Sequence, residues 1–191
     1  VVWTDLHLRA EAPDEVQAFA GQVESLRAGE TLLILGDLFD AWTGPESVRA
    51  SGFAPLRSAL LARRAAGETS ILLRGNRDVL MRPSQAAALG MELADRVLWH
   101  RPTGPVLFSH GDEYCLNDQP YQRLRRTLRR PMVRGLLRCL PARVRIWMGK
   151  KMGKKTQNRK TCAERMFLVL GRYGSTCFRY RQPEGKSSGR W

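Results

Sequence analysis

The segment TLLILGDLFD, residues 31–40, ends an apolar run with two aspartates, and four of its first five residues are aliphatic. Such a run predicts a buried strand. A carboxylate at the end of a buried strand is costly unless it is paired, hydrogen-bonded or bound to a metal ion. The sequence therefore predicts that Asp37 meets a partner, and the fold of this chain has to supply it.

Apolar runs alternate with amphipathic stretches as far as residue 110, which predicts an α/β fold with a largely parallel sheet. The predicted helices cover 12–28, about 53–67 and 84–90. The predicted strands cover 1–3, 31–35, 69–75, 96–101 and 104–110. This order fits one domain of ordinary size, with room for an insertion.

Polar residues follow four of the predicted strands, namely Asp5, His7, Asp37, Asn76 and His110. The carboxyl ends of strands in an open α/β sheet form the edge where ligands bind. Asp5 and His7 are two residues apart, so an extended backbone would point both side chains to one face. Aspartate, histidine and asparagine suit Mn²⁺, Fe²⁺ or Zn²⁺. We interpret the set as a metal site in which a shared Asp37 solves the burial problem.

Each residue of this set, considered alone, can also be explained by a purely structural role. An aspartate after a strand is commonly a turn or N-cap residue, and a lone histidine is commonly structural. His100 has no such partners in the sequence, and we interpret it as structural. Four blocks in this order, flanked by Gly36, Gly75 and Gly111, favour a site, because glycine lets the backbone turn sharply and approach a phosphate.

The charge is divided unevenly along the chain. Residues 1–120 hold 11 Lys and Arg against 16 Asp and Glu, whereas residues 121–191 hold 21 against 2. We interpret the first part as a catalytic core and the second as a basic part for an anionic partner, although a charge run is also typical of a solvated helix face. Residues 121–170 are predicted to be helical and broken at Pro131 and Pro141, and residues 171–191 to be irregular.

The cysteine and hydropathy patterns exclude several classes of protein. The four cysteines have no CxxC spacing, which argues against a zinc knuckle and favours reduced thiols. No apolar run approaches the roughly 20 residues of a membrane-spanning helix, and no signal peptide is recognisable. Because the chain starts in a predicted strand, we expect its N-terminus to be slightly cut.

The four blocks stand in this chain as DLH, GDLFD, GNRD and SHGD. In this form they resemble the calcineurin-like metallophosphoesterases, whose pattern is D-x-H, G-D-x-x-D, G-N-[HR]-[DE], a later His and finally G-H-x-H. The resemblance covers roughly residues 3–170. The forms GDLFDAW, GNRD and HGDEYCLNDQPYQ are similar to a narrower group, the UDP-2,3-diacylglucosamine diphosphatases of lipid A biosynthesis.

The resemblance implies a metallophosphoesterase sandwich with a dinuclear Mn²⁺ site. Asp5 and His7 would hold the first ion, Asp37 would bridge, and Asn76 and His110 would hold the second. The ions would activate a water for in-line attack on phosphorus. The catalytic residues implied are therefore Asp37, Asn76 and His110.

The resemblance also implies the substrate contacts. Asn76 and Arg77 would bind phosphate, with Arg77 using its fork of donors. Asp118 and Tyr121 would contact the remainder of the substrate, as would Thr156 and Lys160. Asp40 and Asp78 would support the neighbouring ligands.

The basic part matches the helical lid that this family carries over the glucosamine and its acyl chains. Residues 131–157 mix apolar side chains with Arg and Lys, a combination that can bind acyl chains and lie on anionic lipid. The implied location is cytoplasmic, peripheral on the cytoplasmic face of the inner membrane. The implied reaction cleaves the pyrophosphate of UDP-2,3-diacylglucosamine to give UMP and 2,3-diacylglucosamine 1-phosphate.

The final G-H-x-H block of the family is absent, and no histidine lies beyond His110. Residues 171–191 do not resemble the family, and we expect a truncated or frame-shifted product. Since each metal would lose one ligand, we expect this chain to bind metal weakly and to have weak or no activity.

Two other functions remain open from the sequence. The chain could be a phosphoesterase for another nucleotide or a phosphodiester, although an apolar, basic lid argues against a purely soluble substrate. The basic part could also bind nucleic acid in a salt-sensitive way. Its few aromatic residues and its many Leu, Val and Ile make this second function the weaker one.

Overall fold

The computed structural model describes residues 1–46, 51–102 and 104–148. Four short strands form a parallel sheet in the order β1-β2-β3-β4. The strands are β1 (Val2–Trp3), β2 (Leu32–Ile34), β3 (Ser70–Leu73) and β4 (Glu92–Ala94). This sheet is the centre of the α/β core, and its carboxyl edge carries the residues discussed below.

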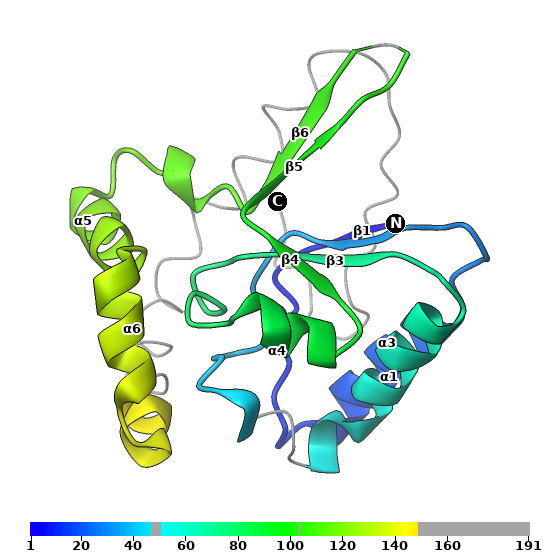
Figure 1. Cartoon of the computed structure of the whole chain (residues 1–191), viewed down its shortest axis with the longest axis horizontal. Coiled ribbons are helices and arrows are strands. Elements are labelled where there is room, and N and C mark those ends of the chain that lie inside the picture. Colours follow the sequence, from blue (N-terminus) through cyan, green and yellow to red (C-terminus); the bar gives the residue numbers. More distant parts are fainter. Residues whose placement is uncertain (47–50, 103, 149–191) are drawn as a thin grey trace, which may run out of the picture.

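Helices α1 (Pro13–Glu24), α3 (Ala54–Ala65) and α4 (Pro83–Ala88) cover one face of the sheet (Figure 1). The apolar residues Val16, Phe19, Ala20 and Val23 recur at helical spacing in α1, so all four are buried on its inner side. Phe19 meets Trp3 of β1 edge to face, with ring centroids 5.4 Å apart. This side of the sheet therefore holds the main apolar core.

The opposite face of the sheet carries a smaller cluster of Leu33, Leu35 and Leu73. Side chains alternate along β2, so Leu33 points away from the helices while its neighbours point toward them. Val97 and Phe108 pack against this cluster from an antiparallel pair, β5 (Arg96–Trp99) and β6 (Val106–Ser109). Figure 1 shows this β5–β6 hairpin projecting away from the sheet.

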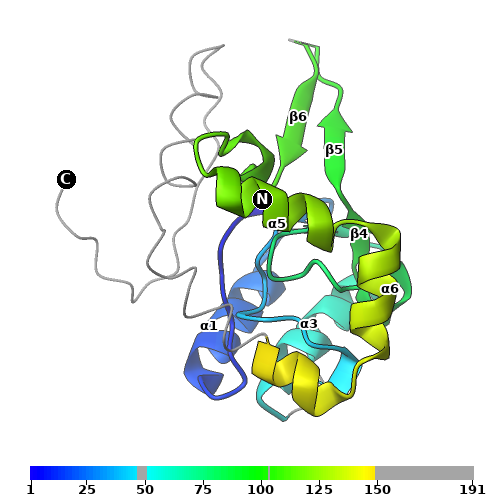
Figure 2. The ribbon, with the colours of Figure 1, turned by 90° about the vertical axis from the view of Figure 1, so that its left-hand side faces the viewer.

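The remaining described elements lie beside the core (Figures 1 and 2). They are the short turn η2 (Asp112–Tyr114), α5 (Gln119–Leu128) and α6 (Pro131–Cys139), and residues 142–148 are also helical. We call residues 119–148 the basic helical segment, because they contain nine arginines and no acidic residue. No helix among the described residues is long and apolar enough to cross a bilayer.

The structure confirms the predicted α/β class, the parallel sheet and the helix breaks near Pro131 and Pro141. Two details of the prediction were wrong. β4 was missed, because three residues give no periodicity and it is the pairing with β3 that makes them a strand. The strands β5 and β6 do not join the parallel sheet, because the few residues between them suit an antiparallel turn and not a parallel crossover. Thr156, Lys160 and the tail 171–191 lie outside the described residues.

Candidate metal centre

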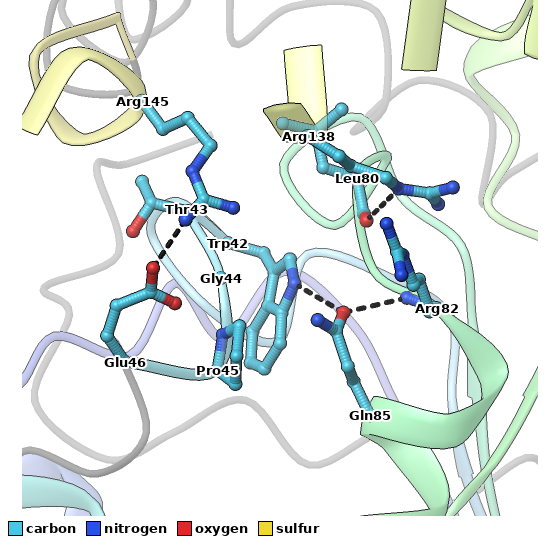
Figure 3. A pocket seen from close by; sticks show the side chains of 10 residues that line it. All are labelled: Trp42, Thr43, Gly44, Pro45, Glu46, Leu80, Arg82, Gln85, Arg138 and Arg145. Atoms are coloured by element: carbon cyan, nitrogen blue, oxygen red, sulfur yellow. Dashed lines mark hydrogen bonds and ion pairs between the residues drawn. The ribbon is translucent and has the colours of Figure 1, made fainter. Parts of the chain in front are cut away.

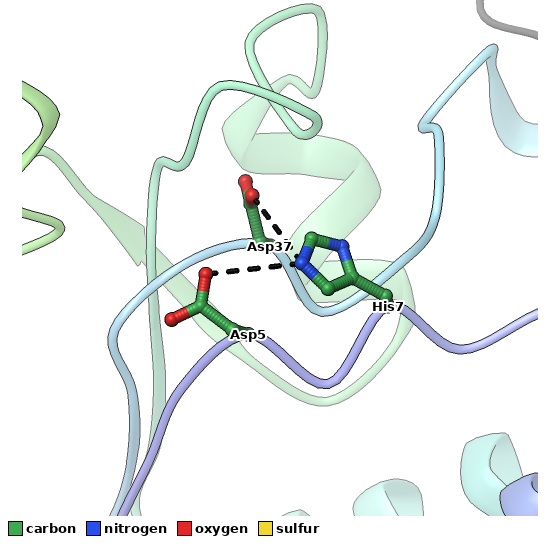
Figure 4. A group of neighbouring side chains, drawn as sticks. All are labelled: Asp5, His7 and Asp37. Carbon is green, nitrogen blue, oxygen red and sulfur yellow. Dashed lines mark ion pairs between the residues drawn. The ribbon is translucent and has the colours of Figure 1, made fainter. Parts of the chain in front are cut away.

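Asp5, His7 and Asp37 meet at the carboxyl edge of the sheet (Figure 4). The His7 Nε2 atom lies 3.8 Å from Asp5 Oδ1 and 4.0 Å from Asp37 Oδ2. One ligand atom from each of the three residues lies within 4.8 Å of the others. Two carboxylates and an imidazole at this spacing suit a divalent cation with oxygen and nitrogen ligands.

The same three residues have an unusual backbone conformation. Asp5, His7 and Asp37 have φ angles of 51°, 48° and 54°, and no other non-glycine residue in the described part of the chain has a positive φ. The prediction that an extended backbone brings Asp5 and His7 to one face was therefore wrong, because both residues turn through the left-handed region. Backbone strain of this kind costs on the order of 1–3 kcal/mol per residue and concentrates at functional sites.

Pairing between the two loops holds this strained backbone in place. The His7 N–H donates to the Asp37 carbonyl at 3.0 Å, and Leu8 forms a parallel bridge with Phe39. The bridge extends the contact between β1 and β2 past the ends of both strands. As a result, the Asp5–His7 loop and the Asp37 loop are fixed relative to one another.

The Asp37 carboxylate is 2% exposed and has polar groups on several sides. The Arg77 backbone N–H donates to Asp37 Oδ1 at 3.0 Å, and the His110 Nε2 atom lies 3.7 Å from the same oxygen. The Arg77 Nε atom lies 3.8 Å from Oδ2. These neighbours are the partners that the strand-ending carboxylate was predicted to need.

Two glycines make this close packing sterically feasible. A Cβ atom at Gly75 would lie 2.2 Å from Asp37 Oδ1, and one at Gly36 would lie 2.7 Å from His110 Nδ1. Gly36 also has a φ of 100°, a backbone conformation that residues with a side chain rarely adopt. The glycines flanking the site thus let the carboxylate and the imidazole approach neighbouring backbone.

His110 follows β6, and one of its two ring nitrogens is hydrogen-bonded to the backbone. Its Nδ1 lies 2.7 Å from the Leu35 carbonyl, so Nδ1 carries the hydrogen and Nε2 faces Asp37. Burial alone would lower the pKa of His110, but the carboxylates of Asp37, Asp112 and Asp5 and the Leu35 carbonyl raise it. The imidazole Nε2 is therefore oriented toward the Asp37 carboxylate.

Asp78 and Asp40 hold neighbouring groups and do not face the cluster directly. Asp78 is fully buried and accepts a hydrogen bond from the Leu38 N–H at 3.3 Å. Burial, together with the charge of Asp37, raises the pKa of Asp78 to about 7. Asp40 accepts a hydrogen bond at 2.8 Å from Arg77 Nη1, which fixes that guanidinium beside the site.

Asn76 and Tyr121 meet on the side of the site that faces the basic helical segment. The Asn76 side chain lies close enough to the Tyr121 hydroxyl to lower its pKa, and the Tyr121 hydroxyl donates to Asp112 Oδ2 at 2.8 Å. Burial and the Asp112 carboxylate raise the pKa of Tyr121, so the hydroxyl stays protonated. Asp118 is the N-cap of α5 and accepts from the Tyr121 N–H at 3.1 Å.

Asp112 is a residue to which the sequence reasoning gave no role. It is 7% exposed and also accepts from Arg125 Nε at 2.8 Å. Burial would raise the pKa of Asp112, but His110, Arg125, Arg129 and Tyr121 lower it, which keeps the carboxylate charged. Tyr121, Arg125 and Arg129 are spaced by four residues, a pattern that puts them on one helix face and could have identified a shared acceptor.

The predicted site residues are thus gathered in two groups around Asp37. Asp5 and His7 cluster with Asp37, whose Oδ2 faces His7, and His110 faces Asp37 Oδ1, while Asn76 lies beside Tyr121. The donor set and the buried, oriented Asp37 carboxylate fit a site for divalent cations.

No family model matches the chain, but it is similar to several curated proteins. It is 38% identical over 156 residues to the UDP-2,3-diacylglucosamine hydrolase of Pseudomonas paraeruginosa, covering 81% of this chain and 65% of that protein. The same-named protein of Pseudomonas aeruginosa is 39% identical over 157 residues, with the same coverage. That of Bordetella pertussis is 38% identical over 148 residues, covering 74% and 57%. The chain spans less than two thirds of the length of these relatives.

The packing of Gly75 against Asp37 gives a first testable prediction. We expect Gly75→Ala to lower the free energy of unfolding by about 1–3 kcal/mol, because the new methyl group overlaps the Asp37 carboxylate. Gly21→Ala in α1 is the matched control, since its Cβ meets nothing within 4 Å, and it should raise stability by about 1 kcal/mol. Urea denaturation of both variants measures the difference. Equal stability of the two variants would contradict the predicted overlap.

The raised pKa of Asp78 predicts how stability changes with pH in the metal-free protein. Between its ordinary pKa of 3.8 and the folded value of about 7, the unfolded state releases the proton more readily than the folded state does. The contribution of Asp78 to stability therefore falls as the pH rises through this window and is constant above it. Unfolding free energies of wild type and Asp78→Asn, measured from pH 4 to 8, should diverge across that range. A pH-independent difference between the two proteins would rule out this assignment.

Proposed function

We propose, from the premise that this chain is a homologue of proteins named UDP-2,3-diacylglucosamine hydrolase, that it hydrolyses UDP-2,3-diacylglucosamine in lipid A biosynthesis. The bond cleaved is the pyrophosphate, and the products are UMP and 2,3-diacylglucosamine 1-phosphate. The observation that carries the proposal is the convergence of Asp5, His7 and His110 on a buried Asp37. This arrangement can hold cations where a pyrophosphate is attacked.

We further propose that the site holds two divalent ions, with Mn²⁺ as the favoured metal. Asp5 and His7 would bind one ion, Asn76 and His110 the other, and Asp37 would bind both. Ions in such a site activate water as a nucleophile and neutralise charge on phosphate oxygens. The chain's own contribution is to fix the ligands in place, through the Leu35 carbonyl for His110 and the Arg77 N–H for Asp37.

Arg77 is suited to bind a phosphate of the substrate. Its Nη1 atom is fixed by the carbonyl and the carboxylate of Asp40 at 2.7 and 2.8 Å. Its Nε atom is buried and has no hydrogen-bond acceptor within the described part of the chain, although it lies 3.8 Å from Asp37 Oδ2. A guanidinium held by one end with a donor left over can orient a phosphate beside the bridging carboxylate.

A pocket of about 220 Å³ lies between the core and the basic helical segment (Figure 3). Trp42, whose backbone N–H donates to the Arg77 carbonyl at 2.9 Å, forms one wall of the pocket. Leu80 lines it from the core, and Arg138 and Arg145 reach it from the basic helical segment. We propose that this pocket takes a part of the substrate beyond the pyrophosphate, so that the basic helical segment acts as a lid.

We also propose that the protein acts in the cytoplasm, on the cytoplasmic face of the inner membrane. The basic helical segment exposes Met132, Leu136 and Trp147, which are 87%, 69% and 61% accessible. Met132 and Leu136 lie four residues apart in α6, on one helix face between arginines. Apolar side chains flanked by cationic ones favour the surface of an anionic bilayer, where an acylated substrate would also be found.

The proposed reaction can be tested by measuring UMP release from UDP-2,3-diacylglucosamine during a Mn²⁺ titration. We expect slow, Mn²⁺-dependent release by this chain and none by Asp37→Asn, because the substitution removes charge from the bridging position. His100→Ala is the matched histidine control and should leave the rate unchanged. Faster hydrolysis of the deacylated sugar nucleotide than of the acylated one would favour a different substrate. Equal rates for wild type and Asp37→Asn would exclude the proposed site.

Membrane association can be tested by co-sedimentation with vesicles. We expect binding to anionic vesicles to drop at least about tenfold in Met132→Glu/Leu136→Glu, because two carboxylates replace apolar contacts at a negatively charged surface. Leu61→Glu in α3 is the control, since Leu61 is also an exposed leucine but lies outside the basic helical segment. Unchanged vesicle binding in the double variant, or salt-sensitive binding to nucleic acid and none to vesicles, would contradict the proposal.

A further inference from the structure

The basic helical segment is attached to the core in an unusual way. In α5 the only buried residue is Gln122, and in α6 no residue is buried. Hydrogen bonds, most of them from arginines, hold these two helices. Arg125 and Arg129 both donate to the carboxylate of Asp112, and Arg138 donates to the Leu80 carbonyl at 2.9 Å. Attachment of α5 and α6 therefore depends on polar groups, not on an apolar interface.

Asp112 is the acceptor on which these contacts converge. Its carboxylate receives the Tyr121 hydroxyl at 2.8 Å, Arg125 Nε at 2.8 Å and Arg129 Nη2 at 3.4 Å. Its backbone carbonyl receives Gln122 Nε2 at 2.8 Å. Four residues spread over two turns of α5 and its C-terminal cap thus contact one buried residue. Hydrogen bonds to a buried charge are among the strong ones in proteins.

The same residue is linked to the candidate metal centre by two short routes. Along the chain, Asp112 follows His110 by two residues, and the glycine between them has a φ of 91°. Through space, the Tyr121 hydroxyl that Asp112 holds also contacts the Asn76 side chain. His110 and Asn76 are the two residues proposed to bind the second ion, so both routes reach the same half of the site.

From this arrangement we propose that Asp112 is a positioning residue that couples docking of α5 to assembly of the Asn76–His110 half of the site. This inference rests on the proposed function for the identity of that half. When α5 is docked, Tyr121 holds Asn76, and Asp112 holds the turn that follows His110. When α5 is released, both constraints are lost together. Asp112 touches no reacting atom in this scheme and acts through the residues it holds.

Amide hydrogen exchange tests the coupling without requiring activity or bound metal. In Asp112→Asn, the amides of α5 should exchange about tenfold faster than in wild type, because charged hydrogen bonds are lost. The Arg77 backbone N–H follows Asn76 in the chain and donates to Asp37, and its hydrogen-exchange rate should rise as well. A residue that merely anchors α5 would loosen the helix and leave the Arg77 amide unchanged, and this outcome would overturn the coupling. Unchanged exchange in α5 would overturn it too.

Two further variants keep the test specific. Glu113→Gln is the matched control, because Glu113 also bonds to Arg125 but makes no hydrogen bond with Tyr121 in the described structure. The Arg77 amide hydrogen should therefore exchange as in wild type. Tyr121→Phe removes one hydroxyl and no charge. It should increase the hydrogen-exchange rate of the Arg77 amide, while the Leu33 and Leu35 amides of the sheet stay protected from exchange. Faster exchange of the sheet amides in Tyr121→Phe, or an unchanged exchange rate of the Arg77 amide, would refute the coupling. Because none of these readouts uses substrate, failure of the proposed hydrolase leaves the result interpretable.

Discussion

The Asp37 carboxylate lies at the end of a buried strand, and its placement governs the rest of the site. A charge in that position has to be compensated by donors or cations. The Arg77 N–H, the His110 ring and the His7 ring all lie within 4.0 Å of its oxygens. Gly75 leaves the space that the carboxylate occupies. Arg77, His110 and His7 lie in three different loops, and Asp37 lies in a fourth. The contacts of one carboxylate therefore fix four segments of the chain relative to one another.

The strained conformation of Asp5, His7 and Asp37 follows from the same constraint. Left-handed backbone at three non-glycine residues is unfavourable and persists only where surrounding contacts hold it. Here the main apolar core, the bridge between Leu8 and Phe39 and the His7 N–H bond supply those contacts. Stability of the core is thus used to hold ligands in positions that they would not adopt alone. Such preorganisation is what a metal centre requires of its protein.

The basic helical segment depends on electrostatics in a different way from the core. The α1, α3 and α4 helices are fixed by apolar burial, whereas α5 and α6 are fixed by arginines that reach Asp112 and core carbonyls. Apolar burial is insensitive to direction, but hydrogen bonds to one carboxylate specify both position and orientation. This difference fits the lid role proposed for the segment, which would need a defined geometry over the site and also a way to open.

Local chemistry in the sequence determined the strand-ending acids, the glycines beside them and the class of the fold. For example, Val16, Phe19, Ala20 and Val23 recur at helical spacing in the sequence, and this spacing predicts the buried face of α1. Tertiary structure alone decided that Asp5 and His7 reach Asp37 through left-handed turns, because backbone strain depends on what holds it. It also decided that β4 is a strand and that Asp112 joins α5 to the site, since both depend on partners distant in sequence. Spacing along a chain reports which residues share a face, but the partner of that face is set only when the chain has folded.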